Sequence, residues 1–284
     1  MSKIKVAELF YSIQGEGRFM GVPSVFLRTF GCNFTCSGFG MPKGEMSKER
    51  DVVAVKADNF KYYNDLPLVS TGCDSYASWD PRFKHLSPVL TSEAIAEQIM
   101  EILPHKEWKD EHLVITGGEP LLGWQRSYPD LLEHDRMKDL KEITFETNGT
   151  QELSVEFNEY LFQEWTRFGR DYDQLTFSVS PKLSVSGEKW EDAIKPEVVK
   201  EYQDVGYTYL KFVVANRYDV AEAEQAINEY RKKGFSGPVY LMPCGGEEGM
   251  YNLNKTAVAH LAMNLGLRYS DRLQIPLFKN AWGT

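Results

Sequence analysis

The cysteines are the residues whose type and spacing most directly suggest chemistry. The chain has four of them, and three residues separate Cys32 from Cys36. In a reducing compartment, thiols this close together more often bind a metal or react than form a disulfide scaffold. The pair by itself is equally compatible with two half-buried thiols in a loop, so both interpretations stay open. The other two cysteines, Cys73 and Cys244, lie far from the pair along the chain.

Three further polar motifs directly follow predicted strands. They are Thr-Gly-Gly-Glu-Pro at 116–120, Glu-Thr-Asn-Gly-Thr at 146–150 and Ser-Pro-Lys at 180–182. Each motif on its own is also typical of a turn or a strand end. In parallel α/β sheets and barrels, however, ligands bind at the carboxyl ends of the strands. Together with the cysteine pair, these motifs therefore predict one pocket at that edge of a sheet.

The elements that would position these motifs alternate between strand and helix. Apolar runs predict strands at 25–28, 112–116, 142–146, 175–179, 209–214 and 239–242. Periodicity and capping residues predict helices at 91–103, 219–233 and 254–265, capped by Thr91 or Ser92, by Asp219 and by Asn254. This alternation indicates βαβ units, a parallel sheet and a single α/β domain over residues 1–284. Residues 39–72 show no clear period, and a connection of this length usually carries function or small elements of its own.

Composition and charge exclude several classes of protein. Of the 284 residues, 42% are hydrophobic and 26% are charged, which is ordinary for a globular protein. The formal net charge of −9 argues against a nucleic-acid-binding surface, because phosphate binding needs clustered Lys and Arg. No apolar stretch approaches the ~20 residues that span a bilayer, and the first residues contain no apolar signal core. We therefore expect a cytoplasmic protein without nucleic-acid or membrane partners.

The motifs taken together resemble those of a known family along nearly the whole chain. The matching segments are residues 10–17 (Phe-Tyr-Ser-Ile-Gln-Gly-Glu-Gly), 21–28, 31–33, the three motifs above and residues 271–280 (Asp-Arg-Leu-Gln-Ile-Pro-Leu-Phe-Lys-Asn). They are similar to segments of the 7-carboxy-7-deazaguanine synthases, lyases of the radical S-adenosylmethionine superfamily. The resemblance implies an incomplete (β/α)6 barrel of the TIM-like type, with the cysteine loop near its mouth.

The chain departs from this family in its cysteines. The family usually spaces three cluster ligands as C-x3-C-x2-C, but Phe39 stands where the third belongs. The segment Gly-Cys-Asp-Ser-Tyr at 72–76 resembles the stretch that normally follows at once, which predicts an insertion at about 39–72. The resemblance then assigns Cys32, Cys36 and Cys73 to one 4Fe-4S cluster with an open iron for S-adenosylmethionine. Cys244 matches no cluster position and is expected to be a buried structural thiol.

The resemblance also implies the reaction and the cofactor contacts. The substrate 6-carboxy-5,6,7,8-tetrahydropterin would be contracted to 7-carboxy-7-deazaguanine with loss of ammonia, a step towards 7-deazapurines such as queuosine. An adenosyl radical would remove a hydrogen from C6 of the pterin and later regain it, which regenerates S-adenosylmethionine. The residues expected to contact this cofactor are Gly118, Glu119, Asn148, Ser180, Pro181 and Lys182. For Glu119, a helix-capping carboxylate is the alternative.

The substrate contacts come from the same resemblance. The expected residues are Ile13, Gln14, Gly15, Glu16, Arg28 and Thr116. Arg28 could pair with the substrate carboxylate through two parallel N–H···O bonds, or could simply be a surface charge on a strand. Ser75 matches a Mg²⁺ ligand of the family, and the substrate carboxylate would share the ion because a hard cation prefers oxygen. The five histidines show no ligand spacing and are expected to be non-catalytic: His85, His105, His112, His134 and His260.

Partners and rival functions complete the sequence-based expectations. The resemblance implies a flavodoxin or ferredoxin as one-electron donor, and a homodimer. Two other functions stay open, namely another radical enzyme such as a glycyl-radical activase, and a cluster-less binding or regulatory protein that uses residues 39–72 for docking. The stretch Gln-Gly-Glu-Gly at 14–17 and the ending at 271–280 argue against the activase.

Overall fold

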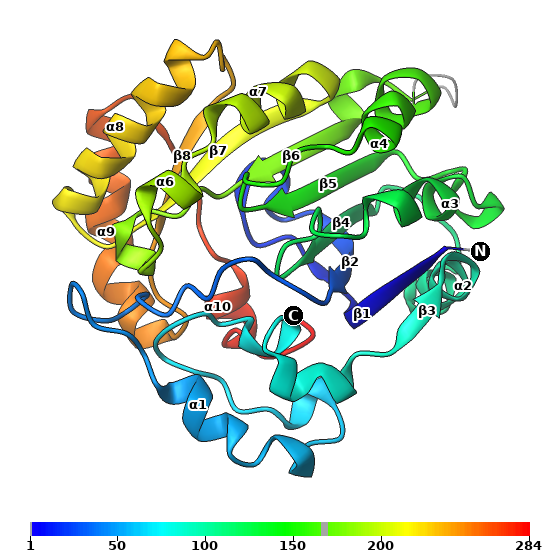
Figure 1. The fold of residues 1–284 in the computed structure, drawn as a ribbon, viewed down its shortest axis with the longest axis horizontal. Helices are drawn as coiled ribbons and strands as arrows, with labels where there is room; N and C mark the ends of the chain where they lie inside the picture. Colours follow the sequence, from blue (N-terminus) through cyan, green and yellow to red (C-terminus); the bar gives the residue numbers. More distant parts are fainter. Residues whose placement is uncertain (1, 166–169) are drawn as a thin grey trace.

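A computed structural model describes residues 2–165 and 170–284. Its strands form one curved sheet in the order β3-β1-β2-β4-β5-β6-β7-β8-β9 (Figure 1). Neighbours are parallel from β2 to β9: β2 (Pro23–Thr29), β4 (His112–Gly117), β5 (Glu142–Thr147), β6 (Leu175–Val179), β7 (Tyr207–Val214), β8 (Val239–Pro243) and β9 (Arg268–Tyr269). The six strands expected from the sequence are confirmed within a few residues, and the short β9 is added. The parallel sheet with helices outside it is the expected incomplete barrel.

Several parallel strands have an apolar outer face and an inner face that carries polar side chains. In β2, Val25 and Leu27 belong to the main core, whereas Arg28 lines a cavity on the other face. In β7, Phe212 lies in the core and Lys211 lines the same cavity. Because successive side chains of a strand point to opposite faces, this alternation directs polar groups from several strands into the barrel.

Two antiparallel strands at one edge of the sheet were not expected from the sequence. β1 (Lys3–Ile13) pairs antiparallel with β2, and β3 (Val89–Thr91) pairs antiparallel with β1. Only the first half of β1 is mostly buried and the second half is half-buried throughout, so its residues show no clean alternation. β1 nevertheless matters for the site, because it carries the segment 10–13 up to the Gln-Gly-Glu-Gly loop.

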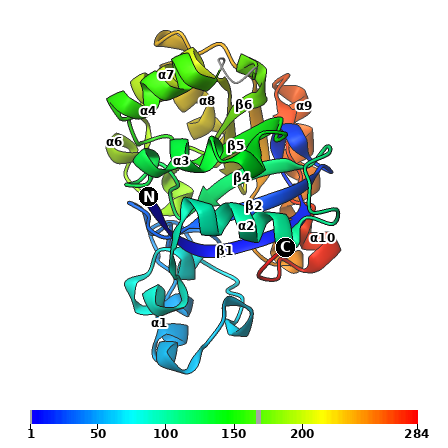
Figure 2. The ribbon, with the colours of Figure 1, turned by 90° about the vertical axis from the view of Figure 1, so that its right-hand side faces the viewer.

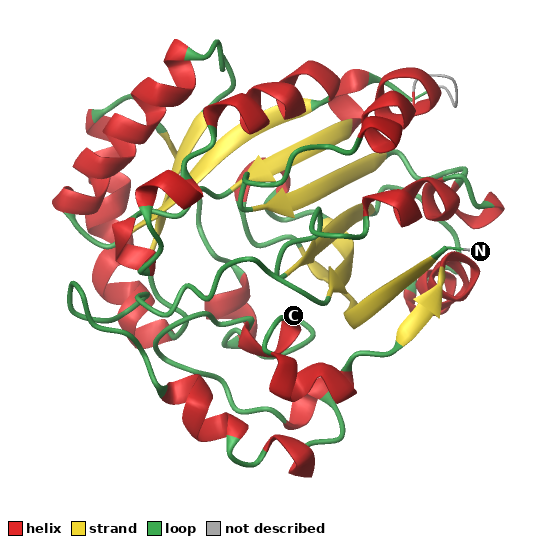
Figure 3. Ribbon diagram, viewed as in Figure 1, coloured by secondary structure: helices red, strands yellow, loops and turns green. Residues whose placement is uncertain are grey.

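Helices cover the outer side of the sheet (Figure 3). They are α2 (Ser92–Ile102), α3 (Tyr128–Leu132), α4 (Val155–Glu159), α7 (Pro196–Val205), α8 (Arg217–Lys232) and α9 (Glu248–Asn264). The shorter α6 (Trp190–Ala193) lies near the cysteine loop, and α10 (Gln274–Phe278) lies near the C-terminus. The first predicted helix and its cap are confirmed, because Thr91 Oγ1 accepts a hydrogen bond from the N–H of Ala94 at 3.2 Å.

The predicted caps of the other two helices were wrong. α8 is capped by Asn216, whose side chain accepts from the N–H of Tyr218 at 2.8 Å, and Asp219 lies in its first turn. α9 already begins at Glu248, so Asn254 lies inside it and donates from Nδ2 to the carbonyl of Cys244 at 3.1 Å. In both cases the side chain that was expected to cap the helix instead hydrogen-bonds with the loop before the helix.

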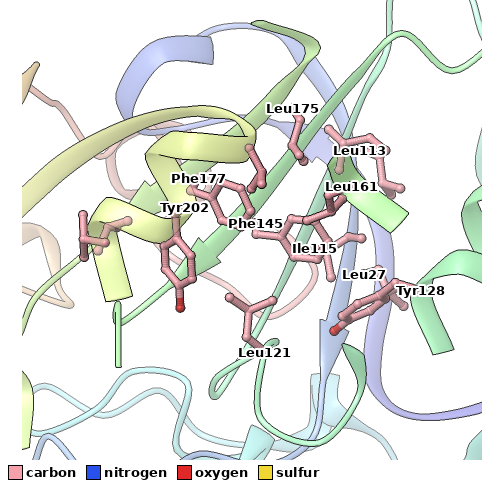
Figure 4. Close-up of a cluster of buried hydrophobic side chains, with 14 of the residues drawn as sticks. Leu27, Leu113, Ile115, Leu121, Tyr128, Phe145, Leu161, Leu175, Phe177 and Tyr202 are labelled. Atoms are coloured by element: carbon pink, nitrogen blue, oxygen red, sulfur yellow. The ribbon is translucent and has the colours of Figure 1, made fainter. Parts of the chain in front are cut away.

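Aromatic rings fill the main core between the sheet and its helices. Phe145 of β5 stacks on Phe177 of β6 with centroids 5.7 Å apart, and Phe177 stacks on Tyr202 of α7 at 4.7 Å (Figure 4). Aromatic pairs of this kind contribute about 0.5–1.5 kcal/mol beyond their burial. They fix the two strands whose carboxyl ends carry the motifs at 146–150 and 180–182.

Residues 39–72 form a small lobe, called here the insertion lobe. It contains α1 (Glu49–Ala54) and short 3₁₀ turns, and it projects below β1 in Figure 2. It has a core of its own, built on the buried Ala57, Tyr63, Leu66 and Val69. The same core includes residues outside the lobe: Ala7, Tyr76, Ala77 and Phe83. The lobe is therefore attached to the barrel by packing as well as by its two chain connections.

Candidate active site

The carboxyl ends of the parallel strands open into one cavity on the inner side of the sheet. The strand-end motifs, the insertion lobe and the C-terminal segment all contribute to its walls. The expected site residues that line it are Ile13, Gln14, Gly15, Glu16, Arg28, Cys32, Cys36, Cys73, Ser75, Thr116, Gly118, Asn148, Ser180 and Lys182. Glu119 and Pro181 were also expected in the site but do not line this cavity.

The insertion lobe returns the chain to the place where it left the barrel. The N–H of Gly72 donates to the carbonyl of Phe39 at 2.7 Å, which closes the lobe at its base. Cys73 follows this closure and packs with Cys32 and Cys36 in one small cluster. The third thiol therefore lies beside the other two, although it is remote from them in sequence.

The donor set of these three thiols suits a cluster of several metal atoms. Among residues 2–165 and 170–284, no three His, Cys, Asp or Glu side chains are grouped tightly enough to hold a single metal ion. The three thiols border a common cavity, and thiolates are the ligand type that iron–sulfur clusters use. Cys244 lines the same cavity, but it lies outside the cluster that the other three form.

Burial makes the three thiols hard to ionise without a positive partner. It raises the pKa of Cys32 to about 12, and it also raises the pKa values of Cys36 and Cys73. The ammonium of Lys182 acts in the opposite direction on all three. Thiolates therefore form at this place when positive charge is bound beside them, as it is by an iron–sulfur cluster.

Neighbouring side chains hold the cysteine loops in place. The Glu188 carboxylate accepts from the backbone N–H of Thr35 at 2.9 Å and of Cys36 at 2.7 Å. The indole N–H of Trp79 donates to the sulfur of Cys73 at 3.4 Å. The first set of bonds fixes the backbone of the loop that carries Cys36, and the second fixes the position of the Cys73 sulfur.

The glycine motif at 116–120 packs its backbone directly against the cysteine loop. A Cβ atom on Gly118 would lie 2.4 Å from the carbonyl oxygen of Gly31 and 2.7 Å from the Cβ of Cys32. The backbone N–H of Glu119 donates to the same carbonyl of Gly31 at 2.7 Å. Only a glycine at position 118 permits this approach.

Glu119 joins two loops and faces away from the cavity. Its carboxylate accepts from Thr147 Oγ1 at 2.7 Å, from the N–H of Asn148 at 2.7 Å and from the N–H of Leu121 at 3.1 Å. The side chain is fully buried, and burial raises the pKa of this carboxyl group. The structure therefore places Glu119 as a link between the motifs at 116–120 and 146–150.

Asn148 and Lys182 line the cavity from the next two strands. Asn148 Nδ2 donates to Asn33 Oδ1 at 2.8 Å, which ties the 146–150 loop to the cysteine loop. Lys182 Nζ donates to Ser180 Oγ at 3.2 Å, so the two polar residues of the Ser-Pro-Lys motif face each other. Pro181, between them, ends the strand and stays outside the lining of the cavity.

A buried network of charges forms around Glu16. Lys211 Nζ donates to Glu16 Oε2, while Glu16 Oε1 accepts from Arg272 Nε at 3.1 Å and from Gln274 Nε2 at 2.8 Å. Burial opposes ionisation of Glu16, but the charges of Lys211 and Arg272 outweigh it and lower its pKa to about 2. Arg272 also reaches Asp74, with Nη2 2.7 Å from Oδ2. The network therefore joins the Gln-Gly-Glu-Gly loop at 14–17, the Gly-Cys-Asp-Ser-Tyr segment at 72–76 and the segment 271–280.

Both polar atoms of the Gln14 side-chain amide form hydrogen bonds within the protein. Its Nε2 donates to Glu146 Oε1 at 3.1 Å and its Oε1 accepts from the N–H of Glu16 at 3.1 Å. The amide thus fixes the Gln-Gly-Glu-Gly loop against β5. Gly15 is pressed against α10, because a Cβ atom there would lie 1.9 Å from Gln274 Oε1.

Arg28 is held in a defined orientation on the inner face of β2. Its Nε donates to Glu8 Oε2 at 2.9 Å, and its Nη1 donates to Ser75 Oγ at 3.3 Å. Ser75 in turn donates to Asp74 Oδ1 at 3.1 Å. Arg28 is thus a cavity residue, which excludes the alternative of a plain surface charge, and it stands beside the hydroxyl that was expected to bind Mg²⁺.

Several charged cavity residues were not singled out from the sequence. They are Glu8, Asp74, Glu146, Lys211 and Arg272. Lys211 could have been found from a local signal, because it is a charged residue within a largely apolar strand, whereas Glu146 shares its strand with Glu142 and two threonines. No local signal marks the partners of Glu8 and Asp74, which are Arg28 and Arg272.

One histidine, His112, hydrogen-bonds with side chains of the two strands on either side of its own strand. His112 is fully buried, with its ring nitrogens 3.3 Å from Ser24 Oγ and 2.8 Å from Thr144 Oγ1. Burial lowers the pKa of His112 to about 3, so the ring stays neutral. It lies outside the cavity residues, at the opposite ends of β2, β4 and β5 from the thiols.

The chain is similar to known proteins along nearly its whole length. No protein-family model matches it. It is 31% identical to 7-carboxy-7-deazaguanine synthase of Halobacterium salinarum, over 98% of this chain and 91% of that one. It is 27% identical to the enzyme of the same name from Pyrobaculum aerophilum, over 99% and 97% of the two chains. A crystal structure of QueE from Escherichia coli superposes with a TM-score of 0.54 at 19% identity, covering 95% and 94% of the chains, which supports the fold.

No helix in the described ranges is long and apolar enough to cross a lipid bilayer.

Proposed function

The chain belongs to the family of 7-carboxy-7-deazaguanine synthases, and on this premise we propose that the cavity at the strand ends is its catalytic site. The enzyme is a radical S-adenosylmethionine lyase that converts 6-carboxy-5,6,7,8-tetrahydropterin to 7-carboxy-7-deazaguanine with loss of ammonia. The reaction is a step of 7-deazapurine biosynthesis, which leads to preQ0 and queuosine. The observation that carries the assignment of the site is the return of Cys73 to the side of Cys32 and Cys36.

The cofactor side of the cavity is the wall with the thiols. Cys32, Cys36 and Cys73 would hold the 4Fe-4S cluster, and Gly118 and Lys182 border the adjacent space for S-adenosylmethionine. When bound, the two groups supply an electron and a carbon-centred radical. The chain's own contribution is to bury the thiols and fix their loops. The Lys182 ammonium favours the thiolate form, and the close backbone contact at Gly118 packs the 116–120 loop against the cysteine loop.

The substrate side of the cavity is the wall with Arg28. Its guanidinium is the group that would pair with the pterin carboxylate, and its neighbour Ser75 offers a hydroxyl oxygen for Mg²⁺. Asp74 adds a carboxylate beside that hydroxyl, which suits a hard cation. Ile13, Gln14, Gly15, Glu16 and Thr116 would border the pterin ring. Of these, Glu16 stays ionised, and its carboxylate oxygens can accept hydrogen bonds from N–H groups of the ring.

The reaction requires partners that the chain does not contain. We propose a flavodoxin or a ferredoxin as the one-electron donor, because reduction of an iron–sulfur cluster needs an external electron source. A homodimer working in the cytoplasm is proposed from the family resemblance.

Anaerobic reconstitution with iron and sulfide tests the assignment. We expect the reconstituted chain to bind iron and sulfide and to form 7-carboxy-7-deazaguanine from the carboxy-pterin. Cys73→Ser should lose both the bound iron and the turnover, whereas the matched variant Cys244→Ser should keep both. A chain that binds zinc or no metal would instead support the docking alternative. A cluster-loaded chain that cleaves S-adenosylmethionine but leaves the pterin unchanged would point to a different radical enzyme.

A further inference from the structure

The insertion lobe makes an aromatic contact with the C-terminal segment. The ring of Trp282 lies 5.5 Å from the ring of Tyr63 in the lobe and 5.6 Å from that of Tyr76, both edge to face. Tyr63 is buried, and its hydroxyl donates to the carbonyl of Ala77 at 2.9 Å. Figure 1 shows the C-terminus next to α10 and above α1 of the lobe. The lobe thus supplies one of the two rings that hold Trp282.

The same segment reaches the substrate side of the cavity. Trp282 and Gly283 both line it, together with Glu8 and Arg28. Trp282 also packs against the buried cluster that contains Ala7, the residue before Glu8, and Glu8 Oε2 accepts from Arg28 Nε at 2.9 Å. A path of contacts therefore leads from Tyr63 through Trp282 and the segment 7–8 of β1 to Arg28.

The position of Glu8 determines the orientation of the Arg28 guanidinium. Both side chains are largely buried, with 7% of Glu8 and 17% of Arg28 exposed, so water cannot easily replace a lost partner. A guanidinium binds a carboxylate through two parallel bonds only if its plane is fixed. Because Trp282 packs against the cluster that contains Ala7, loss of the Trp282 ring would shift the backbone that carries Glu8 and so rotate or release the guanidinium plane.

We propose that Trp282 is a positioning residue through which the insertion lobe orients Arg28 for the carboxylate of the substrate. The inference rests on the proposed function of Arg28, and it adds a role for the lobe that the family reaction does not require. The lobe then acts on substrate affinity and leaves the chemistry at the thiols unaffected. In the described part of the chain, Trp282 packs with Tyr63, Tyr76 and their cluster, which does not include the three cysteines.

Steady-state kinetics of the reconstituted full-length enzyme tests this directly. We expect Trp282→Ala and Tyr63→Leu to raise KM for the carboxy-pterin about tenfold, the size of one lost charge-assisted hydrogen bond, with kcat changed less than about twofold. Trp282→Phe keeps a ring between the two tyrosines and should restore most of the affinity. Tyr62→Leu is the matched control, because Tyr62 is a neighbouring lobe tyrosine that is 70% exposed, and its KM should not change.

A double-mutant cycle tests the path itself. Glu8→Gln should raise KM to a similar extent, and Glu8→Gln combined with Trp282→Ala should raise it by much less than the product of the two single effects. If the two effects multiply fully, or if Glu8→Gln leaves KM unchanged, the proposed path is wrong. Should Trp282→Ala fail to fold or to load iron, Tyr63→Leu and Glu8→Gln decide the question.

Cleavage of S-adenosylmethionine separates this inference from the proposed function. The wild-type enzyme and all four single-site path variants should form 5′-deoxyadenosine under reducing conditions at similar rates without pterin. A wild-type chain that forms none would contradict the proposed function. A wild-type chain that forms it and turns over pterin, but whose Trp282→Ala variant keeps the wild-type KM, would overturn only the role of Trp282.

Discussion

At the scale of single residues, the site depends on positions where the protein backbone comes very close to a neighbour. Gly118 is such a position, because its backbone touches Gly31 and Cys32 with no space for a side chain. The fully buried Glu119 next to it holds the following loop through three hydrogen bonds. The glycine motif is therefore a structural joint between the cysteine loop and the strand ends, in addition to any contact with cofactor.

Gly118→Ala tests this joint. The added methyl group would overlap Gly31 and displace the cysteine loop, so we expect at least about a fivefold loss of bound iron after reconstitution, equivalent to about 1 kcal/mol or more. Gly249→Ala is the matched control, because a Cβ atom at Gly249 meets no heavy atom within 4 Å. Iron and sulfide content per chain is the measurement. Equal iron content in both variants would show that the cysteine loop adapts freely.

At the scale of elements, the insertion lobe behaves as a small folded unit built on a short apolar core. Its buried residues pack against Tyr76 and Phe83, which belong to the segment after Cys73. Its closing hydrogen bond from Gly72 to Phe39 fixes where Cys73 re-enters the barrel. The stability of the lobe and the position of the third thiol are thus linked through the same few residues.

Leu66→Ala and Leu68→Ala compare the inside and the outside of the lobe. Leu66 is 4% exposed and Leu68 is 40% exposed. Truncation of a buried leucine costs about 2–5 kcal/mol, so Leu66→Ala should open the lobe locally, whereas Leu68→Ala should have little effect. Limited proteolysis is the measurement, with faster cleavage between residues 43 and 61 expected only for Leu66→Ala. Equal cleavage rates would mean that the lobe has no core of its own.

At the scale of the whole molecule, buried charges connect parts of the chain that are far apart in sequence. Glu16 is paired with Lys211 and Arg272, and Arg272 is paired with Asp74. These four residues come from the opening loop, from β7, from the segment beyond β9 and from the cysteine segment. The network closes the barrel at its open side, where the strands leave no direct hydrogen-bonded connection among the described residues.

This network predicts a loss of stability in acid. The pKa of Glu16 is lowered from 4.5 to about 2 by folding, so its contribution is complete above pH 4.5 and is lost as the pH falls towards 2. The shift corresponds to about 3 kcal/mol of unfolding free energy. Urea unfolding of the metal-free protein at several pH values is the measurement. Glu16→Gln should be less stable at pH 6 and should lose stability less steeply below pH 4.5, while the exposed Glu45→Gln should follow the wild type.

The sequence by itself determined the local parts of this protein. Apolar residues in 112–116 and at alternate positions of 175–179 identified parallel strands, because the strand face that packs against the helices must be apolar. The Gly-Cys-Asp-Ser-Tyr segment identified the third thiol across the insertion by its resemblance to a family motif. Polar motifs after the strands indicated the correct edge of the sheet, since parallel strands all end on the same side.

The tertiary structure decided everything that depends on contacts between distant residues. Only the fold shows that Glu119 faces a neighbouring loop, that Lys211 meets Glu16, and that Trp282 packs into the insertion lobe. β1 and the true caps of α8 and α9 also escaped prediction, because their half-buried or polar residues satisfy partners outside the local segment. Local periodicity records which face of an element is buried, whereas the partner of a buried charge or ring is fixed only when the whole chain has packed.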